Sequence, residues 1–215
     1  MAATTSTDVG ESLHVEQTKF DRRLAEILDC AARVFAEKGY QGASMRDLSR
    51  ACGTSLAGLY HYFEGKEKLL YLIQKHTFET ILERLTTRLC GLTDAEARVR
   101  VFIANHLEFF LANRNAMSVL SHEDNTLQGP YRQEIATLKR EYYRACRDEL
   151  ENLKRERGLE FETRIAVLSL FGMVNWIYTW HNARTDGNAA ALAQQMGDIF
   201  LTGLTGARTK VSEAR

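Results

Sequence analysis

Proline and long apolar runs are scarce in this sequence. Pro130 is the only proline in 215 residues, and since proline interrupts helices, long helices can form along most of the chain. The longest apolar stretch, residues 165–180, is broken by Ser169 and Asn175 and falls short of a membrane span. The first 18 residues hold no apolar segment of the signal-peptide type. We therefore expect an all-α, cytoplasmic protein with no membrane contact.

Cysteine pairs and an excess of one charge are also missing. The four cysteines, Cys30, Cys52, Cys90 and Cys146, lie far apart without metal-type spacing, which predicts free thiols in a reducing compartment. Lys and Arg total 28, as do Asp and Glu, so net charge indicates no polyanionic partner. A small part of the chain can still be locally basic while acidic residues elsewhere balance its charge.

Catalytic spacing is absent as well. The sequence has no Ser/His/Asp arrangement, no paired carboxylates, no Gly-rich phosphate loop and no metal motif. Four of its histidines are scattered through the later part of the chain: His76, His106, His122 and His181. We therefore expect no enzyme, no catalytic residues, no metal site and no cofactor.

Helical signals fill the chain after a small, polar stretch at residues 1–18, which we expect to be a disordered tail. Apolar residues recur at helical spacing from Leu24 to Phe35, and Gly39 is placed to end that helix. Ser44 and Asp47 form a capping-box pattern that starts a short helix. Gly53 ends that helix, and a second short helix is expected over residues 56–62. A long helix should follow, from residue 66 to about 90.

The remaining residues predict further helices at about 95–112, 115–126, 131–157, 162–183 and 189–205. We accordingly divide the chain into a tail (1–18), a head of short helices (19–65) and a longer helical body (66–207).

Two short helices joined by a glycine turn and preceded by a longer helix are typical of a helix-turn-helix. The apolar contacts between the two short helices are expected from Leu48, Cys52, Leu59 and Phe63. The other face of the second helix carries small residues, hydroxyls and an imidazole, which suit close approach to DNA and hydrogen bonds to phosphate. The following Lys66 stands at a helix N-terminus, where an anion is favoured.

Residues 39–40, 44–48 and 52–69 resemble the DNA-binding domain of the TetR family, with the glycine turn and the Leu-Tyr-His-x-Phe pattern in register. The resemblance covers about residues 20–70. Ser49 stands where the family usually has alanine, and Thr54 where it usually has valine, which affects fine packing rather than fold. The resemblance implies DNA contacts at Ser44, Arg46, Thr54, Ser55, Leu56, Ala57, Gly58, Tyr60, His61 and Lys66.

Other interpretations of the head stay open. Tyr60 can be a packed aromatic and His61 a solvated histidine, while Leu56 fits either the core or the DNA-facing side. Arg22 and Arg23 are either phosphate contacts or a solvated charge pair.

The body carries aromatic and soft side chains at helical spacing, which line adaptable ligand cavities but are also common in plain cores. The candidate ligand-binding residues are Phe102, His106, Phe109, Phe110, Tyr142, Cys146, Met173, Trp176, Ile177 and Trp180.

Residues 171–181 resemble the penultimate helix of TetR-family regulators that respond to acyl-CoA and control lipid breakdown. This resemblance implies a hydrophobic thioester as ligand. The basic residues available for its phosphates are Arg114, Arg132, Lys139, Arg140 and Arg184.

In the TetR family, the last two long helices pair with those of a second subunit, which implies a homodimer. The apolar seam is expected from Leu168, Phe171, Met196, Ile199, Phe200 and Leu204, with Gly172, Gly197 and Gly203 permitting close approach. A dimer also suits a head whose one short recognition helix is too small to specify an operator alone.

The sequence thus predicts a dimeric, ligand-responsive repressor that binds a palindromic DNA operator. The first alternative is a regulator of efflux that senses a hydrophobic or cationic drug. Such a site requires buried carboxylates, for which Glu108, Glu123 and Asp124 are the candidates. A more remote alternative is a helical enzyme or interaction module that binds no DNA.

Overall fold

The computed structural model describes residues 19–123, 126–182 and 184–206. The predicted tail and Asp124 lie outside the described residues. Within them the chain forms helices and no strand, which confirms the all-α prediction. In chain order the helices are α1 (Lys19–Gly42), α2 (Met45–Ala51), α3 (Leu56–Tyr62), α4 (Lys66–Leu89), α5 (Ala95–Ala112), α6 (Arg114–His122), α7 (Gly129–Arg157), α8 (Thr163–Asn175), α9 (Ile177–Trp180) and α10 (Ala189–Gly206).

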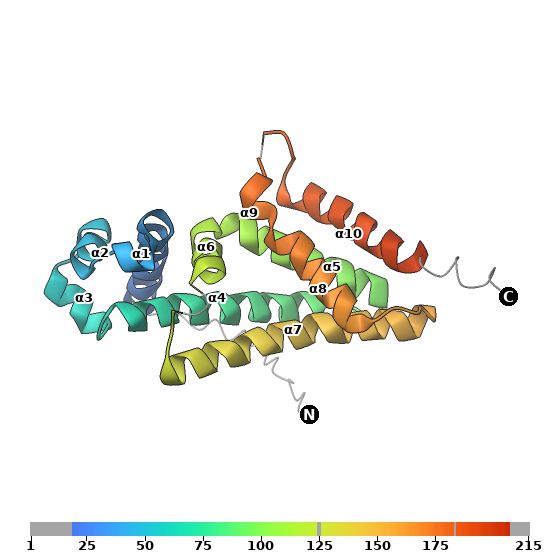
Figure 1. The fold of residues 1–215 in the computed structure, drawn as a ribbon, viewed down its shortest axis with the longest axis horizontal. Helices are drawn as coiled ribbons and strands as arrows, with labels where there is room; N and C mark the ends of the chain where they lie inside the picture. Colours follow the sequence, from blue (N-terminus) through green and yellow to red (C-terminus); the bar gives the residue numbers. More distant parts are fainter. Residues whose placement is uncertain (1–18, 124–125, 183, 207–215) are drawn as a thin grey trace, which may run out of the picture.

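Helices α1, α2 and α3 form the head, at the left end of Figure 1. Gly39 leaves helical geometry with φ 70°, but α1 resumes and ends only at Gly42. The predicted capping box at the start of α2 is confirmed. The Ser44 hydroxyl accepts the Asp47 amide at 3.1 Å, and the Asp47 carboxylate accepts the Ser44 amide at 3.0 Å. These reciprocal bonds satisfy two N–H groups at the exposed start of a short helix.

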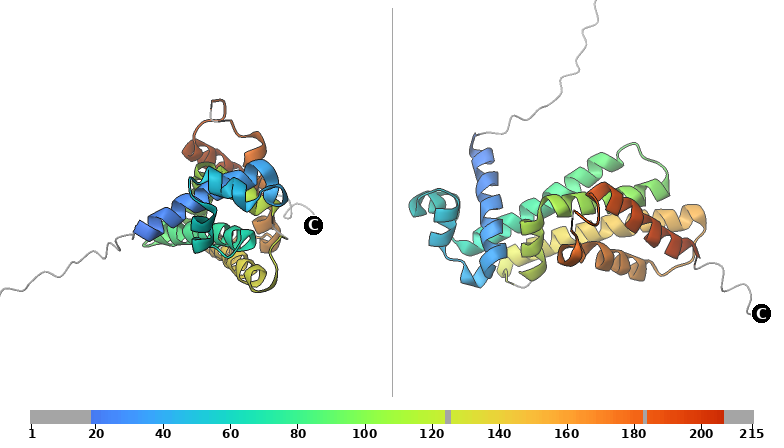
Figure 2. Two further views of the ribbon diagram at one scale, coloured as in Figure 1. Left: turned by 90° about the vertical axis from the view of Figure 1, so that its left-hand side faces the viewer. Right: turned by 90° about the horizontal axis from the view of Figure 1, so that it is seen from above.

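Helix α4 leaves the head and continues into the body, where α7 runs beside it (Figures 1 and 2). Near the head, Tyr71 of α4 stacks on Tyr131 of α7, with ring centroids 4.4 Å apart. Glu134 of α7 accepts a hydrogen bond from the Tyr71 hydroxyl at 2.7 Å and pairs with Lys75 at 2.6 Å. These contacts hold the first turns of α7 to the head end of α4.

The segment predicted as one helix over 162–183 is two helices, because the helix breaks at Trp176. The Trp176 carbonyl accepts both the Thr179 amide at 3.1 Å and the Thr179 hydroxyl at 2.7 Å. A local side-chain bond of this kind competes with the i to i+4 pattern of an α-helix. Helix α6 is also shorter than predicted, ending at His122.

Two clusters of buried apolar residues form the interior. The head cluster contains the four residues predicted to join α2 and α3, with exposures of 0% for Leu48, 9% for Cys52, 0% for Leu59 and 1% for Phe63. It also takes in residues 69–73 of α4, Val119 of α6, and Leu127 and Ile135. The body cluster joins the rest of α4 to α5–α10. Phe78 packs against both clusters, so α4 belongs to both interiors.

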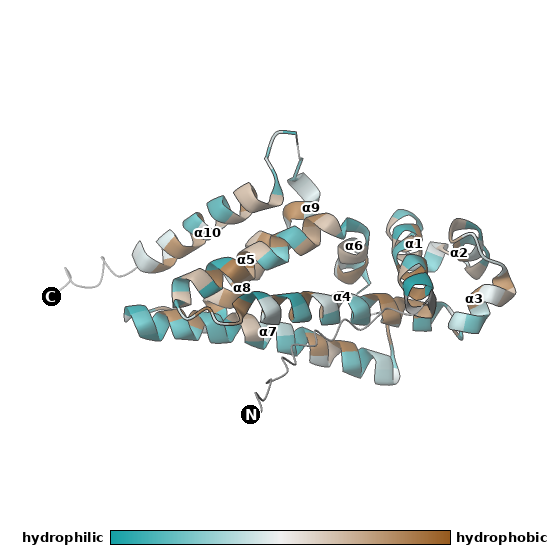
Figure 3. Cartoon of the chain, turned by 180° about the vertical axis from the view of Figure 1, so that it is seen from behind, coloured by the Kyte–Doolittle hydropathy of each residue, from teal (hydrophilic) through white to brown (hydrophobic). Residues whose placement is uncertain are grey.

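Apolar side chains also lie on the surface of the last long helices. Ile165 and Leu168 of α8 and Ile199 of α10 are exposed to 55%, 47% and 67%, and Figure 3 shows the hydrophobic residues on these helices. Met196 and Phe200 of the predicted seam are instead buried within their own chain, at 8% and 6% exposure. None of the described helices is both long enough and apolar enough to cross a bilayer.

Candidate DNA-binding and ligand-binding sites

The turn between α2 and α3 has the tight geometry that the glycine predicts. Gly53 adopts φ 59°, a left-handed conformation that glycine accepts without steric cost. The Gly53 amide donates to the Arg50 carbonyl at 3.3 Å, and the Thr54 amide donates to the Ser49 carbonyl at 3.0 Å. The turn therefore closes on α2, and α3 follows directly from it.

Helix α3 presents one buried and one exposed face. Leu59 is fully buried, whereas Tyr60 is 50% exposed. Among the ten predicted DNA contacts, the exposed ones are Ser44, Arg46, Ser55, Ala57, Tyr60 and His61. The half-buried ones are Thr54, Leu56, Gly58 and Lys66. The exposed set offers hydroxyls, a guanidinium and an imidazole, groups that hydrogen-bond to phosphate.

Ser44 and Ser55, which cap α2 and α3, differ in whether the hydroxyl hydrogen is free to bond an outside molecule. The Ser44 hydroxyl donates to the Asp47 carboxylate at 2.6 Å, so its hydrogen is already used. Lys38 and Ser44 together hold the pKa of Asp47 well below its usual value. The Ser55 hydroxyl accepts the Gly58 amide at 2.9 Å and keeps its own hydrogen for an outside acceptor.

Lys66 has a structural role that the sequence did not predict. Its ammonium donates to the Tyr40 carbonyl at 2.7 Å and the Ala43 carbonyl at 3.0 Å, and it lies 4.3 Å from the centroid of the Tyr40 ring. Lys66 thus ties the start of α4 to the connection between α1 and α2. An ammonium has three N–H donors, so one remains for the phosphate contact that the sequence predicts.

Gly58 is required for the packing of the head itself. A Cβ atom at this position would lie 2.8 Å from the Thr54 hydroxyl oxygen and 3.1 Å from the Ser55 hydroxyl oxygen. The absence of a side chain at residue 58 therefore leaves the hydrogen bond that caps α3 undisturbed. It also lets the backbone of α3 approach another molecule closely.

A cavity of about 420 Å³ lies in the body, a volume within the range of small-molecule sites. It is open to solvent on one side, where its lining residues Ser121 and Asn175 are exposed. Its walls come from α4, α5, α6, α7 and α8. The lining residues are Phe78, Ile81, His106, Met117, Leu120, Ser121, Lys139, Tyr142, Tyr143, Phe171 and Asn175.

The ionisable groups of this cavity are neutral or basic. His106 and Tyr142 are buried and lie 3.0 Å apart, from Nδ1 to the hydroxyl oxygen. Burial lowers the pKa of His106 to about 4, and the Asn175 amide offsets only part of this effect. Burial also lowers the pKa of Lys139 and raises that of Tyr142. No carboxylate is among the residues that line the cavity in the described part of the chain.

The structure brings two of the ten predicted ligand residues, His106 and Tyr142, to the cavity wall. Five others are buried in the body cluster outside the lining: Phe102, Phe109, Phe110, Cys146 and Ile177. Two of them pack directly behind it, since the Phe102 ring lies 5.1 Å from that of Tyr142 and the Phe110 ring 5.8 Å from that of His106. Met173 is half-buried outside the lining, whereas Trp176 and Trp180 are 61% and 47% exposed. The break at Trp176 explains the two tryptophans, because the predicted continuous helix would have carried on the inward face of α8.

Most of the lining was not predicted from the sequence. Phe171, assigned to the dimer seam, lines the cavity instead. Of the five basic residues proposed for CoA phosphates, Lys139 alone is in the described lining, whereas Arg114 bonds His181 at 2.8 Å. The phenylalanine at 78 and the methionine at 117 carry the soft, aromatic character expected of a pocket. Neither helix contributed a candidate for the apolar lining, although Arg114 of α6 was proposed for the CoA phosphates.

The carboxylates proposed for a cationic ligand lie elsewhere. Glu108 pairs with Arg88 at 2.8 Å. Glu123 accepts the Tyr40 amide at 3.1 Å and the Thr126 hydroxyl at 2.6 Å. Both carboxylates are therefore engaged in contacts within the protein and outside the cavity lining.

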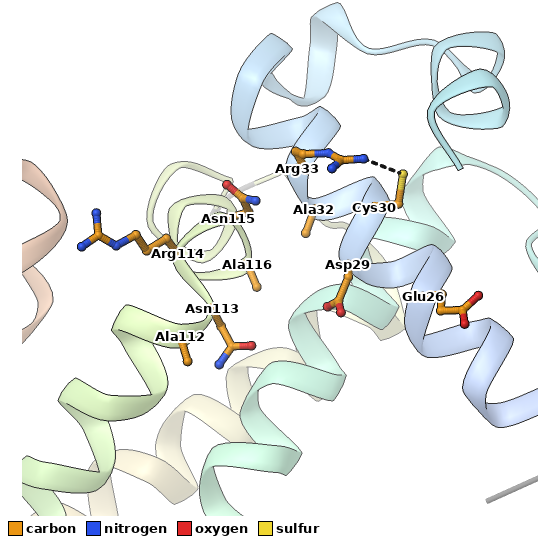
Figure 4. A pocket seen from close by; sticks show the side chains of 10 residues that line it. All are labelled: Glu26, Asp29, Cys30, Ala32, Arg33, Ala112, Asn113, Arg114, Asn115 and Ala116. Carbon is orange, nitrogen blue, oxygen red and sulfur yellow. Dashed lines mark hydrogen bonds between the residues drawn. The ribbon is translucent and has the colours of Figure 1, made fainter. Parts of the chain in front are cut away.

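A second, more polar cleft of about 500 Å³ lies between α1 and the junction of α5 and α6 (Figure 4). Its walls carry both charges, with Asp29 and Arg33 on α1 and Arg114 on α6. The Arg33 guanidinium contacts the Cys30 sulfur at 3.6 Å. This cleft marks the joint between head and body, beside the packing of α1 on α6.

Two protein-family models match this chain, one over the head and the first turns of α4 and the other over most of the body. The family model described as bacterial regulatory proteins, tetR family, matches residues 27–71. The model described as tetracyclin repressor-like, C-terminal domain, matches residues 92–204, more than half of the chain.

Two of the proteins that are similar to this chain in sequence are bacterial regulators. The transcriptional repressor KstR2 of Rhodococcus jostii (strain RHA1) is 27% identical over 101 residues, which are 47% of this chain and 50% of KstR2. The chain thus spans half the length of this relative. The fatty acid metabolism regulator protein of Bacillus subtilis (strain 168) is 21% identical over 184 residues, which are 83% of this chain and 94% of the relative.

Among solved structures, AibR in complex with isovaleryl coenzyme A and operator DNA is similar to this chain with a TM-score of 0.73 and 27% identity. The similarity covers 82% of this chain and 97% of AibR.

Replacing Gly58 with alanine is a test of the α3 cap. In an open helix this change stabilises by up to about 1 kcal/mol. Here the clash with Thr54 and Ser55 reverses the sign, and we expect a loss of about 1–3 kcal/mol in the free energy of unfolding. Urea unfolding followed by circular dichroism measures it. Gly42→Ala, where the nearest atom is 4.0 Å away, is the control and should not destabilise. A stabilised G58A protein would contradict the geometry.

Proposed function

Since this chain belongs to the TetR family of bacterial regulatory proteins, we propose that it is a one-component repressor released from a palindromic operator by an acyl-CoA. The family is one of DNA-binding transcriptional regulators, and dimerisation is general in it. The operator, the ligand class and the direction of the response are parts of the proposal. The observation that carries the ligand class is the body cavity, which is apolar and has no described carboxylate in its lining.

The exposed face of α3 and its flanks supports operator binding by the residues that the resemblance implies. Arg46, Tyr60 and His61 are exposed, and α3, which carries the last two, lies at the end of the head in Figure 1. Ser55 keeps a free hydroxyl hydrogen, and Lys66 keeps a free N–H donor. We propose that these groups contact phosphates and base edges of one half-site, with the second half-site taken by a second subunit.

The exposed apolar residues of α8 and α10 support a dimer seam shifted from the predicted one. Ile165, Leu168 and Ile199 are the large apolar side chains exposed there. Burying such side chains against a second subunit would stabilise a dimer by about 25 cal/mol per Å² of apolar surface. Phe200 and Met196 of α10 are buried in the body cluster and hold α10 to the rest of the body.

The chemistry of the cavity supports an acyl chain over a cationic drug. Phe78, Ile81 and Leu120 offer apolar walls, whereas Lys139 places a basic group in the lining that would repel a cation. The relative from Bacillus subtilis is named a fatty acid metabolism regulator, and the similar protein AibR has been solved in complex with isovaleryl coenzyme A.

The shared helices support a route from cavity to head. Met117 and Leu120 of α6 line the cavity, whereas Val119 of the same helix lies in the head cluster. The Glu123 carboxylate at the end of α6 holds the Tyr40 amide of α1. We propose that filling the cavity shifts α6 and α4 and, with them, the separation of the two heads.

A gel-shift assay on the protein's own upstream DNA, with acyl-CoAs from butanoyl to dodecanoyl as probes, tests the function. Affinity should rise about fourfold per methylene, from about 0.8 kcal/mol each, until the cavity is full. By linkage, each ligand should weaken operator binding by the factor by which DNA weakens ligand binding. Leu120→Trp narrows the cavity and should shorten the longest chain that binds. Release by a cationic dye and by no acyl-CoA would favour the drug-sensing alternative.

Lys66→Ala should weaken DNA binding about equally on all sequences and lower the dependence of log affinity on log salt by about one unit. The physical reason is the loss of one phosphate contact. Arg164→Ala, at an exposed position of α8, is the matched control and should leave the slope unchanged. An unchanged slope in a K66A protein with a folded head would remove Lys66 from the DNA contacts.

Ile199→Asp should give a folded monomer, because Ile199 is 67% exposed in the single chain and is proposed to be buried only in the dimer. Phe200→Asp, one residue away, should instead destabilise the fold, since it places a charge in the body cluster. Sedimentation velocity and thermal unfolding distinguish the two results. An I199D protein that stays dimeric at micromolar concentration would show that the seam lies elsewhere.

A further inference from the structure

One polar atom in the cavity wall lacks a hydrogen-bond partner. His106 of α5 is 2% exposed, and its Nε2 atom makes no hydrogen bond in the part of the chain that the structure describes. The same side chain lines the cavity. The Asn175 side chain lies in the same lining and raises the pKa of the ring, but it leaves Nε2 without a partner. Buried polar groups are nearly always paired, so an unpaired ring nitrogen beside an empty volume points to a partner supplied by a ligand.

The neighbouring tyrosine decides which hydrogen-bonding role this atom has. The Tyr142 hydroxyl lies 3.0 Å from the other ring nitrogen, Nδ1, and has no other hydrogen-bond partner among the described residues. Burial raises the pKa of Tyr142, so the phenol keeps its hydrogen. A neutral imidazole nitrogen accepts hydrogen bonds better than a phenol oxygen does. The Tyr142 hydroxyl therefore donates to Nδ1, and the imidazole hydrogen is on Nε2.

The charge around His106 keeps the ring neutral. Burial lowers its pKa to about 4, and Lys139 of α7 adds a basic group to the same lining. Tyr142, Tyr143 and Asn175 are the other polar groups of α7 and α8 in the lining. The site thus offers the neutral N–H group of His106, with the Asn175 amide beside it and apolar side chains around it, which suits a carbonyl oxygen.

We propose that the Nε2–H group of His106 donates a hydrogen bond to a carbonyl oxygen of the ligand, which in an acyl-CoA is the thioester carbonyl. This inference rests on the proposed function and deepens it, because it makes the cavity selective for the carbonyl as well as for the chain. The acyl chain then lies along Phe78, Ile81 and Leu120. His106 is a binding residue, and Tyr142 positions it by fixing its tautomer.

The test compares two ligands that differ only in the carbonyl: the acyl-CoA of best-bound length and the S-alkyl-CoA thioether of the same length. Isothermal titration calorimetry on the full chain measures both affinities. We expect the wild-type protein to prefer the thioester about fivefold to tenfold, the usual worth of one hydrogen bond. His106→Leu should bring the two affinities within twofold, whereas His106→Gln, which retains an N–H donor, should keep part of the preference.

Phe171→Leu is the matched control from the same cavity lining. It should weaken both ligands equally and leave the preference intact. The free fatty acid of the same length is a further probe, and a preference for it over the thioester would identify a carboxylate as the source of the carbonyl oxygen.

Failure of this inference is distinguishable from failure of the proposed function. Equal affinities of the wild-type protein for thioester and thioether would overturn the role of His106 while acyl-CoA binding stands. A preserved preference in H106L would also overturn it. Binding of neither ligand by the wild-type protein would overturn both. Equal wild-type affinities would decide against the inference without any variant, and the H106Q comparison assigns the preference to His106 where H106L does not fold.

Discussion

The packing of α4 and α6 into two apolar interiors is the constraint on which the rest of this molecule depends. Residues 69–73 of α4 lie in the head cluster, and Ile81 and Leu85 of the same helix lie in the body cluster. Interiors this dense do not deform continuously. A displacement of α4 or α6 by a bound molecule must therefore be accommodated in the head as well. The hydrogen bond from the Tyr40 amide to the Glu123 carboxylate joins α1 to the end of α6 as well.

The head was predictable to the level of single residues because its signals are local. A capping box, a left-handed glycine and four apolar positions determine two short helices and their crossing, and each of these depends on residues within one or two turns. The same locality explains what was missed. The bonds from Lys66 to the Tyr40 and Ala43 carbonyls join residues 23 or more positions apart, and no pattern in the sequence marks them.

The cavity was much harder to predict. Periodicity identifies which face of a helix turns inward, but a packed core and a cavity wall require the same apolar residues. Phe110 and Phe171 are both aromatic residues of body helices, yet the first is fully buried in the cluster and the second lines the cavity. Whether a space stays open depends on how side chains from five helices meet. His106 and Tyr142 were among the candidates because they lie with other aromatic residues at helical spacing, a pattern shared by the candidates that do not line the cavity.

The break after α8 has a practical consequence for spectroscopy. The chain has two tryptophans, Trp176 and Trp180, and both are exposed within five residues of Asn175, which lines the cavity. The described head contains none. Intrinsic fluorescence excited at the indole band therefore reports on this one segment, without background from the DNA-contacting part. The fluorescence of these two tryptophans is therefore sensitive to changes at the edge of the cavity.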